Sequence, residues 1–114
     1  MSRLPIVWDA RYSPVFPESH RFPMAKFQLL KDWVDLHVPE TRCFSPSPCA
    51  LEILTATHHP AYVEGFQTGT LDQKAIREIG LPWSEGLRDR TRLALGGSIQ
   101  TCELAREFGL ASHL

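Results

Sequence analysis

The 114-residue sequence lacks an excess of charge of either sign, a long apolar run and a C-x-x-C motif. Twelve Lys and Arg against thirteen Asp and Glu give a net charge of −1, which argues against non-specific nucleic-acid binding. No apolar run approaches the roughly 20 residues of a membrane-spanning helix. The N-terminal MSRLPIVWDARY also lacks the long apolar core of a secretion signal. We therefore expect a cytoplasmic protein with no nucleic-acid and no membrane partner.

Cysteine is scarce and odd in number, with only Cys43, Cys49 and Cys102. Three cysteines without metal-binding or redox spacing predict reduced thiols, and small buried side chains are the usual form of free cysteine. Cys49 with a distant histidine would make a nucleophilic pair, but nothing around it in the sequence supplies an electropositive setting. Burial is the favoured interpretation.

The composition is that of a single globular domain, with 43% hydrophobic and 22% charged residues. Apolar runs predict short strands at residues 5–9, 41–44 and 110–114, with helical patterns between them. This order predicts an α/β fold with a parallel sheet and flanking helices. Three short strands are few for a parallel sheet, which is normally covered on both faces, so we expect the sheet of residues 1–114 to be incomplete.

Helices are predicted at residues 24–37, 51–54, 61–66 and 71–79, and from residue 85 to 108. Ser47 followed by Pro48 is expected to cap the second helix, and Ser84 the last. Glycines are expected to end three of the helices: Gly69, Gly80 and Gly109. Apolar positions in the first helix predict one face formed by Phe27, Leu30, Val34 and Leu36. In the last helix they predict an inward stripe of Leu87, Thr91, Leu95, Ile99, Cys102 and Ala105.

Gly96 and Gly97 interrupt the last helix at a combined cost of about 2 kcal/mol relative to alanine. A helix tolerates this where another backbone or a ligand comes very close. Tight packing and the floor of a pocket both remain open as explanations.

Two further stretches hold polar rings. The Pro-rich loop (residues 10–23) contains three prolines and is too irregular for a helix or strand, and long ordered loops often carry function. His58 and His59 are adjacent, so their side chains point in different directions, and no other ligand stands at a metal-binding spacing. We expect a loop that leads into a helix, with one ordered imidazole, rather than a metal site.

Four segments together resemble the N-terminal part of the histone deacetylase family, in particular the bacterial histone-deacetylase-like and acetoin-utilisation amidohydrolases. In chain order they are PIVWD, SHRFPMAKFQLL, THHPAYVEGF and GLPWSEGLRDRTRLALGGSIQTCELA. The resemblance covers essentially all 114 residues. It implies an arginase–deacetylase type fold and a zinc hydrolase that removes acetyl groups from lysine or polyamine amides.

In that family two aspartates and a histidine hold the zinc, which polarises the amide carbonyl and activates water. A tandem His pair moves protons and a tyrosine helps to hold the oxyanion. None of these elements is expected here: the one Asp-x-His, Asp35-Leu36-His37, and the pair His58–His59 both precede the Gly-Gly helix, whereas the family's ligands and its His pair follow that helix. We therefore expect no catalytic residue and no metal ligand in residues 1–114, which would be an inactive N-terminal portion of a longer zinc-dependent enzyme.

What the resemblance assigns to this sequence is scaffold and rim. His20, Phe22 and Pro23 fall on a loop that lines the approach to the metal, and Pro82 and Trp83 on a second rim loop (residues 80–83). Gly80 stands where several eukaryotic members have an aspartate that grips the substrate backbone. Trp83 would offer an aromatic wall, or it would be ordinary core. Near an interior cavity that releases acetate the resemblance places Lys26, Gly96 and Gly97; a cation there suits a carboxylate, although a plain surface lysine is the alternative.

A second hypothesis is a stand-alone, non-enzymatic protein that binds a partner through an unfinished sheet edge and the apolar residues 110–114. On the enzyme hypothesis, acetylated lysine in proteins, acetylpolyamines and small acetyl-amides all remain open as substrates.

Overall fold

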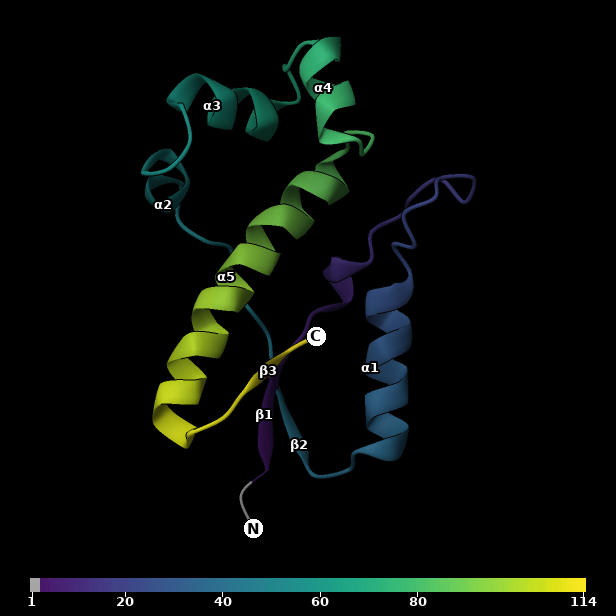
Figure 1. Ribbon diagram of the computed structural model, residues 1–114, viewed down its shortest axis with the longest axis vertical. Coiled ribbons are helices and arrows are strands. Elements are labelled where there is room, and N and C mark those ends of the chain that lie inside the picture. The colour runs from purple at the N-terminus through teal and green to yellow at the C-terminus, as the bar shows by residue number, and fades with distance from the viewer. Residues whose placement is uncertain (1–2) are drawn as a thin grey trace.

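The computed structural model describes residues 3–114 and has a small parallel sheet with helices around it (Figure 1). The strands are β1 (Leu4–Val7), β2 (Thr41–Phe44) and β3 (Ser112–His113). Their order is β2-β1-β3, and both pairings are parallel. The predicted α/β class, the three strand positions and the parallel sheet are therefore confirmed.

The middle strand, β1, carries the sheet's apolar centre. Ile6 and Val7 are 1% and 0% exposed. Leu4 of β1 is in register with Thr41 of β2, and Ile6 with Ser112 of β3. β3 pairs with β1 alone among residues 3–114, so its other edge carries no strand.

Within the described residues, six helical segments surround or extend this sheet: η1 (Ala10–Tyr12), α1 (Lys26–His37), α2 (Leu51–Thr55), α3 (Pro60–Thr68), α4 (Gln73–Ile79) and α5 (Glu85–Phe108). α5 packs on β1 and β3, and α1 lies on the other side of the strands (Figure 1). α2, α3 and α4 gather around the first half of α5, away from the sheet. No helix among the described residues is both long and apolar enough to cross a membrane.

The helix ends follow local chemistry that the sequence predicted. The Ser84 hydroxyl accepts a hydrogen bond from the Leu87 amide at 3.0 Å and so begins α5. His59 Nδ1 accepts from the Ala61 amide at 3.1 Å, with Pro60 at the first position of α3. This confirms the loop with one ordered imidazole. Three left-handed glycines end helices as expected: Gly69, Gly80 and Gly109.

The start of α2 differs from the prediction. Its cap is Ala50, without a side-chain hydrogen bond, and not Ser47. The Ser47 carbonyl instead lies directly against Gly96 of α5, and the Cys49 amide donates to the Arg92 carbonyl at 3.1 Å. Because these contacts hold residues 47–49 against α5, the helix begins only at Leu51.

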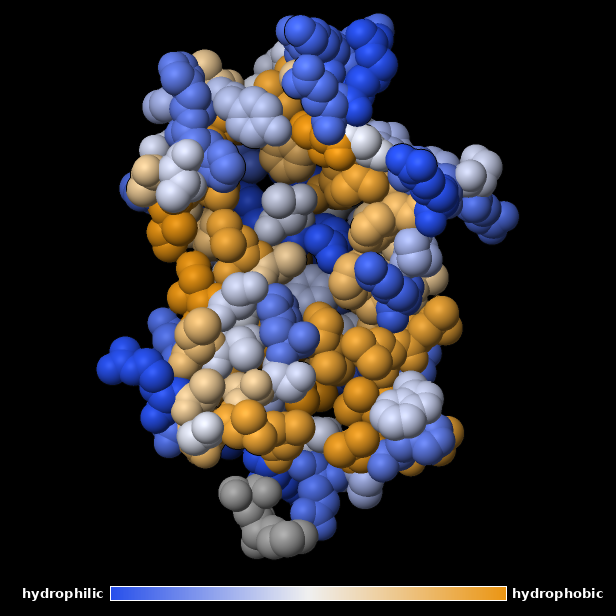
Figure 2. Space-filling view, viewed as in Figure 1, coloured by the Kyte–Doolittle hydropathy of each residue, from blue (hydrophilic) through white to orange (hydrophobic). Residues whose placement is uncertain are grey.

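The predicted apolar faces are also partly wrong. In α5, Leu95, Ile99 and Cys102 are exposed, and the buried residues are Leu87, Leu93, Gly96, Gly97 and Leu104. The cause is that Gly96 faces the backbone of residues 47–49 and Gly97 faces Tyr12 and His113, so the buried face of α5 runs through the two glycines and not through Leu95 and Ile99. In α1, Leu30 and Leu36 were predicted to face inward, but both are exposed. Figure 2 shows the hydrophobic side chains on the surface of this helix. The three thiols are free as predicted, but only Cys49 is buried; Cys43 is exposed like Cys102.

Candidate functional site

The Pro-rich loop and the second loop meet although they lie 60 residues apart in the sequence. The Phe22 amide donates to His20 Nδ1 at 3.0 Å, so the proton of the neutral ring sits on Nε2. That Nε2 donates to the Gly80 carbonyl at 3.1 Å. The structure thus brings His20 from the first expected rim segment against Gly80 from the second.

A hollow of about 590 Å³ lies within the Pro-rich loop and the start of α1. His20, Phe22 and Pro23, which the resemblance places at a rim, all line it. Phe16 packs edge-on against both His20 and Phe22, with ring centroids 5.0 and 6.3 Å away. These contacts give the loop an aromatic wall. The loop follows β1 and η1 and so lies beyond the carboxyl end of β1, the end of a parallel sheet at which α/β proteins usually bind ligands.

Lys26 is an exposed residue at the start of α1. Its Nζ lies 4.7 Å from the centroid of the Phe22 ring and 5.2 Å from that of Phe27. Lys26 does not line the hollow of the Pro-rich loop. It also lines neither the hollow at Gly96 nor the cleft next to Arg92. It therefore sits beside the Pro-rich loop, apart from Gly96 and Gly97, with which the resemblance groups it.

Trp83 of the second loop packs on α3. Its indole N–H donates to the Phe66 carbonyl at 2.7 Å. The ring lies so close to Gly69 that a Cβ there would come within 2.7 Å of it, and the positive φ of Gly69 also suits glycine. The neighbouring Pro82 is exposed and also lines none of the three hollows. Trp83 thus connects the second loop to α3.

Gly96 and Gly97 serve two different close approaches. Gly96 faces backbone, the Ser47 carbonyl and the Cys49 amide, and lines a hollow of about 420 Å³ between α2 and α5. Gly97 faces side chains, the Tyr12 hydroxyl and the His113 ring, whose Nε2 would lie 2.6 Å from a Cβ at Gly97. Both explanations offered by the sequence therefore apply to Gly96, and close packing applies to Gly97.

Below Gly97 lies a polar cluster that sequence reasoning missed. The Tyr12 hydroxyl and His113 Nε2 form a hydrogen bond of 2.7 Å between η1 and β3. Arg90 Nε donates to the Tyr12 carbonyl at 3.0 Å, and its guanidinium stacks 4.4 Å above the Phe27 ring. Ser98 Oγ reaches His113 Nδ1 at 3.3 Å.

Burial controls the protonation of this cluster. It raises the pKa of Tyr12 to about 12 and lowers the pKa of His113, which the Arg90 charge lowers further. Burial also lowers the pKa of Arg90. At neutral pH the hydroxyl is protonated and the imidazole neutral, so the two share a hydrogen bond between uncharged groups. A tyrosine with so high a pKa is a poor proton-transfer group near neutrality, and its part here is to tie β3 to η1.

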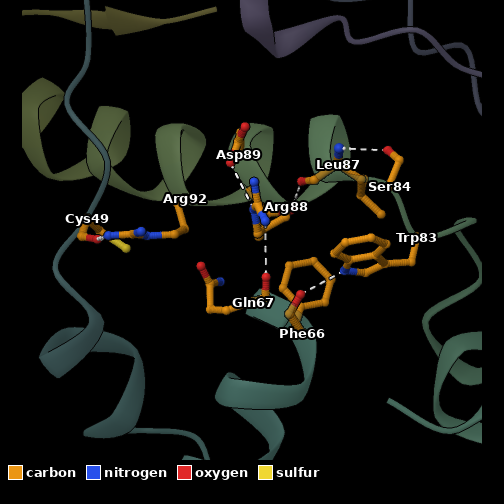
Figure 3. A network of polar contacts seen from close by, with 10 residues as sticks. Cys49, Phe66, Gln67, Trp83, Ser84, Leu87, Arg88, Asp89 and Arg92 are labelled. Atoms are coloured by element: carbon orange, nitrogen blue, oxygen red, sulfur yellow. Dashed lines mark hydrogen bonds and ion pairs between the residues drawn. The ribbon is translucent and has the colours of Figure 1, made fainter. Parts of the chain in front are cut away.

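A second network joins α3 and the residue 49 segment to α5 (Figure 3). Arg88 Nη1 donates to the Gln67 carbonyl at 3.2 Å. Arg92 donates twice to the Cys49 carbonyl, from Nε at 3.2 Å and from Nη2 at 2.8 Å. Next to Arg92, a cleft of about 260 Å³ opens between these helices. In the sequence, the spacing of Arg90, Leu93 and Gly97 along one face of α5 is the pattern that could have revealed the cluster around Tyr12 and His113.

Metal-ligating side chains do not gather anywhere in residues 3–114: no three of His, Cys, Asp or Glu come together. The residues present therefore do not fit a zinc site. What they do form is an aromatic hollow at the end of a parallel sheet, a neutral Tyr–His contact and a cleft next to an arginine.

No family model matches the chain. A search of known proteins finds an uncharacterized protein of Picosynechococcus sp. that is 43% identical over 111 residues. The match covers 96% of this chain and 37% of that relative, so the chain spans little more than a third of the relative's length.

Proposed function

We propose that residues 1–114 are the N-terminal portion of a zinc-dependent, histone-deacetylase-like hydrolase of the arginase–deacetylase fold, which removes acetyl groups from lysine or polyamine-type amides. The observation that carries the proposal is the meeting of the two loops. Residues of both segments that the resemblance assigns to the rim are joined by the His20–Gly80 hydrogen bond.

The aromatic wall of the Pro-rich loop suits such a substrate. The methylene chain of an acyl-lysine or an acylpolyamine is apolar and would pack on Phe16 and Phe22. The acylated nitrogen, unlike a free amine, carries no charge. Gly80 offers its carbonyl to His20 and has no side chain to grip a peptide backbone. This favours recognition of the acylated chain over recognition of a long protein segment.

The side chains of residues 3–114 do not fit a metal site, so this chain is assigned neither the zinc ligands nor the histidines that transfer protons. On this proposal they belong to segments outside residues 1–114. The roles left to this chain are to line the substrate approach with aromatic rings and to fix β3 next to β1 through the Tyr12–His113 contact.

The first test is an acetate-release assay on the longer Picosynechococcus relative. Acetyl-lysine peptides and acetylpolyamines are supplied with zinc, with and without a chelator. We expect turnover that the chelator abolishes and metal restores. A folded, zinc-loaded relative that hydrolyses none of these substrates, or does so regardless of chelation, would contradict the proposal. The 114-residue chain alone should release no acetate above background.

A second candidate function is partner binding through the free edge of β3. The observation that favours it is the edge itself, which pairs with no strand among residues 3–114, next to Leu110, which is 67% exposed. Size-exclusion chromatography with light scattering and an apolar dye tests it. Self-association or strong dye binding supports this candidate, whereas a monomer that leaves the dye dark argues against it.

A further inference from the structure

The cleft beside Arg92 is apolar almost throughout. Its walls come from four helices: Leu54 of α2, Val63 and Phe66 of α3, Ile79 of α4 and Leu87 of α5. Its volume of about 260 Å³ is below that of sites for drug-sized ligands, so only a small molecule fits inside it.

Among the residues that line the cleft, Arg92 alone carries a permanent charge. Among residues 3–114, no carboxylate lies within ion-pair distance of Arg92. Arginine has five N–H donors, and two of those in Arg92 are used on the Cys49 carbonyl. Three donors and the full positive charge are therefore left without a partner in the described part of the chain.

The surroundings hold Arg92 in place before any ligand arrives. The Cys49 amide donates to the Arg92 carbonyl while the Arg92 side chain donates back to the Cys49 carbonyl. This double contact depends on Gly96, because a side chain there would collide with the Ser47 carbonyl. In Figure 3 the guanidinium lies alongside Cys49, with Gln67 of α3 facing it. The cation is pre-organised, which lowers the ordering cost of binding.

We infer that this cleft binds a small apolar carboxylate, with the hydrocarbon part among the walls and the carboxylate on Arg92. A guanidinium recognises a carboxylate through paired N–H donors. A single unpaired cation matches a head group of one negative charge better than a phosphate of nearly two. The site is separate from the hollow of the Pro-rich loop and does not rest on the proposed hydrolase function.

The test is a calorimetric titration of the 114-residue chain with hexanoate and with hexanol, alongside amide chemical-shift mapping. We expect hexanoate to bind at least about tenfold more tightly than hexanol, because only the acid can use the charge of Arg92. Shifts should concentrate on α2, α3 and the first half of α5. Equal affinity for the two probes, shifts confined to the Pro-rich loop, or no binding of hexanoate would overturn the inference.

Two variants on the same helix sharpen the result. R92Q removes the charge at the cleft and should abolish the preference for hexanoate over hexanol. R88Q is the matched control, since Arg88 also donates from α5 to a carbonyl, that of Gln67, but does not line the cleft. It should keep the preference. If R92Q does not fold, R92K keeps the charge, and the two probes on the unmodified chain still decide the matter.

Discussion

The sheet layer (β1–β3, η1, α1 and residues 93–108 of α5) and the helical lobe (α2–α4 and residues 85–92 of α5) are held together differently. The centre of the sheet layer is closely packed, with Ile6, Val7 and Leu93 at 1% exposure or less. In the lobe, α2 and α4 bury no residue. Its helices are tied by side chains that donate to backbone carbonyls: Trp83 to Phe66, Arg88 to Gln67 and Arg92 to Cys49.

This difference explains where the apolar cleft beside Arg92 lies. Side chains that interdigitate leave few voids, whereas helices held apart by long polar side chains leave clefts between them. The lobe accordingly carries the apolar cleft beside Arg92, and the sheet layer carries the closed contact of Tyr12, His113 and Gly97.

The largest effect should come from the position that joins the two regions. G96A places a methyl group against the Ser47 carbonyl and the Cys49 amide, which are backbone atoms that cannot rotate away. We expect a loss of about 3 kcal/mol or more in the free energy of unfolding, measured by urea denaturation. E103A, on the exposed side of the same helix, is the control and should stay within about 0.5 kcal/mol of the parent. A G96A chain as stable as the parent would show that the 47–49 segment does not rest on α5.

Two leucines of α5 compare the regions directly. Leu93 is 1% exposed under the sheet layer and Leu87 is 3% exposed beside the cleft. We expect L93A to cost about 4 kcal/mol and L87A about 2 to 3 kcal/mol, because Leu87 already borders empty space and has fewer partner atoms to lose. Urea denaturation of both variants measures the difference. A larger loss at Leu87 would reverse the assignment of tight packing to the sheet layer.

In the lobe, W83F tests how much the hydrogen bond from the Trp83 indole to the Phe66 carbonyl contributes to stability. It keeps an aromatic ring near Gly69 but leaves the Phe66 carbonyl without its indole partner. The expected cost is about 1 to 2 kcal/mol of unfolding free energy. W33F, at a tryptophan that is 54% exposed on α1, should change stability little. Equal small losses in the two variants would mean that the Trp83 hydrogen bond contributes nothing to holding the loop on α3.

The smallest effect concerns the pH dependence of the sheet layer. Burial lowers the pKa of His113 in the folded chain below its ordinary value of 6.5, so the unfolded chain binds this proton more readily. The stability due to neutral His113 is complete above the ordinary pKa and is lost as the pH falls through it toward the folded value. We therefore expect the unfolding free energy of the parent, relative to H113Q, to fall as the pH is lowered through 6.5. A difference that is flat, or that rises as pH falls, would contradict the buried, neutral state of His113.

The sequence predicted the parts of the fold that local chemistry determines. Ser84, His59 and the helix-ending glycines act within a few residues of their own positions, and the strand runs were recognisable from their apolar content. The inward face of α5 was not predictable in the same way, because Gly97 turns toward Tyr12 and His113, groups that lie far from it or past the helix. The carbonyl partners of Arg88 and Arg92 likewise depend on where α3 and the residue 49 segment come to rest.

The candidate site follows the same division. The resemblance identified His20, Phe22 and Pro23, which do share one hollow, and the Gly-Gly pair, which does mark close approaches. It could not show that Trp83 donates to α3 or that Lys26 sits beside the Pro-rich loop, since both depend on tertiary packing.

The most direct test of the central claim is a chimera in which this chain replaces the 111 aligned residues of the Picosynechococcus relative. We expect chelator-sensitive acetate release from acetyl-lysine or acetylpolyamine within about tenfold of the relative's own kcat/KM. The contradicting result is a folded chimera that releases no acetate while the parent relative does so under the same conditions.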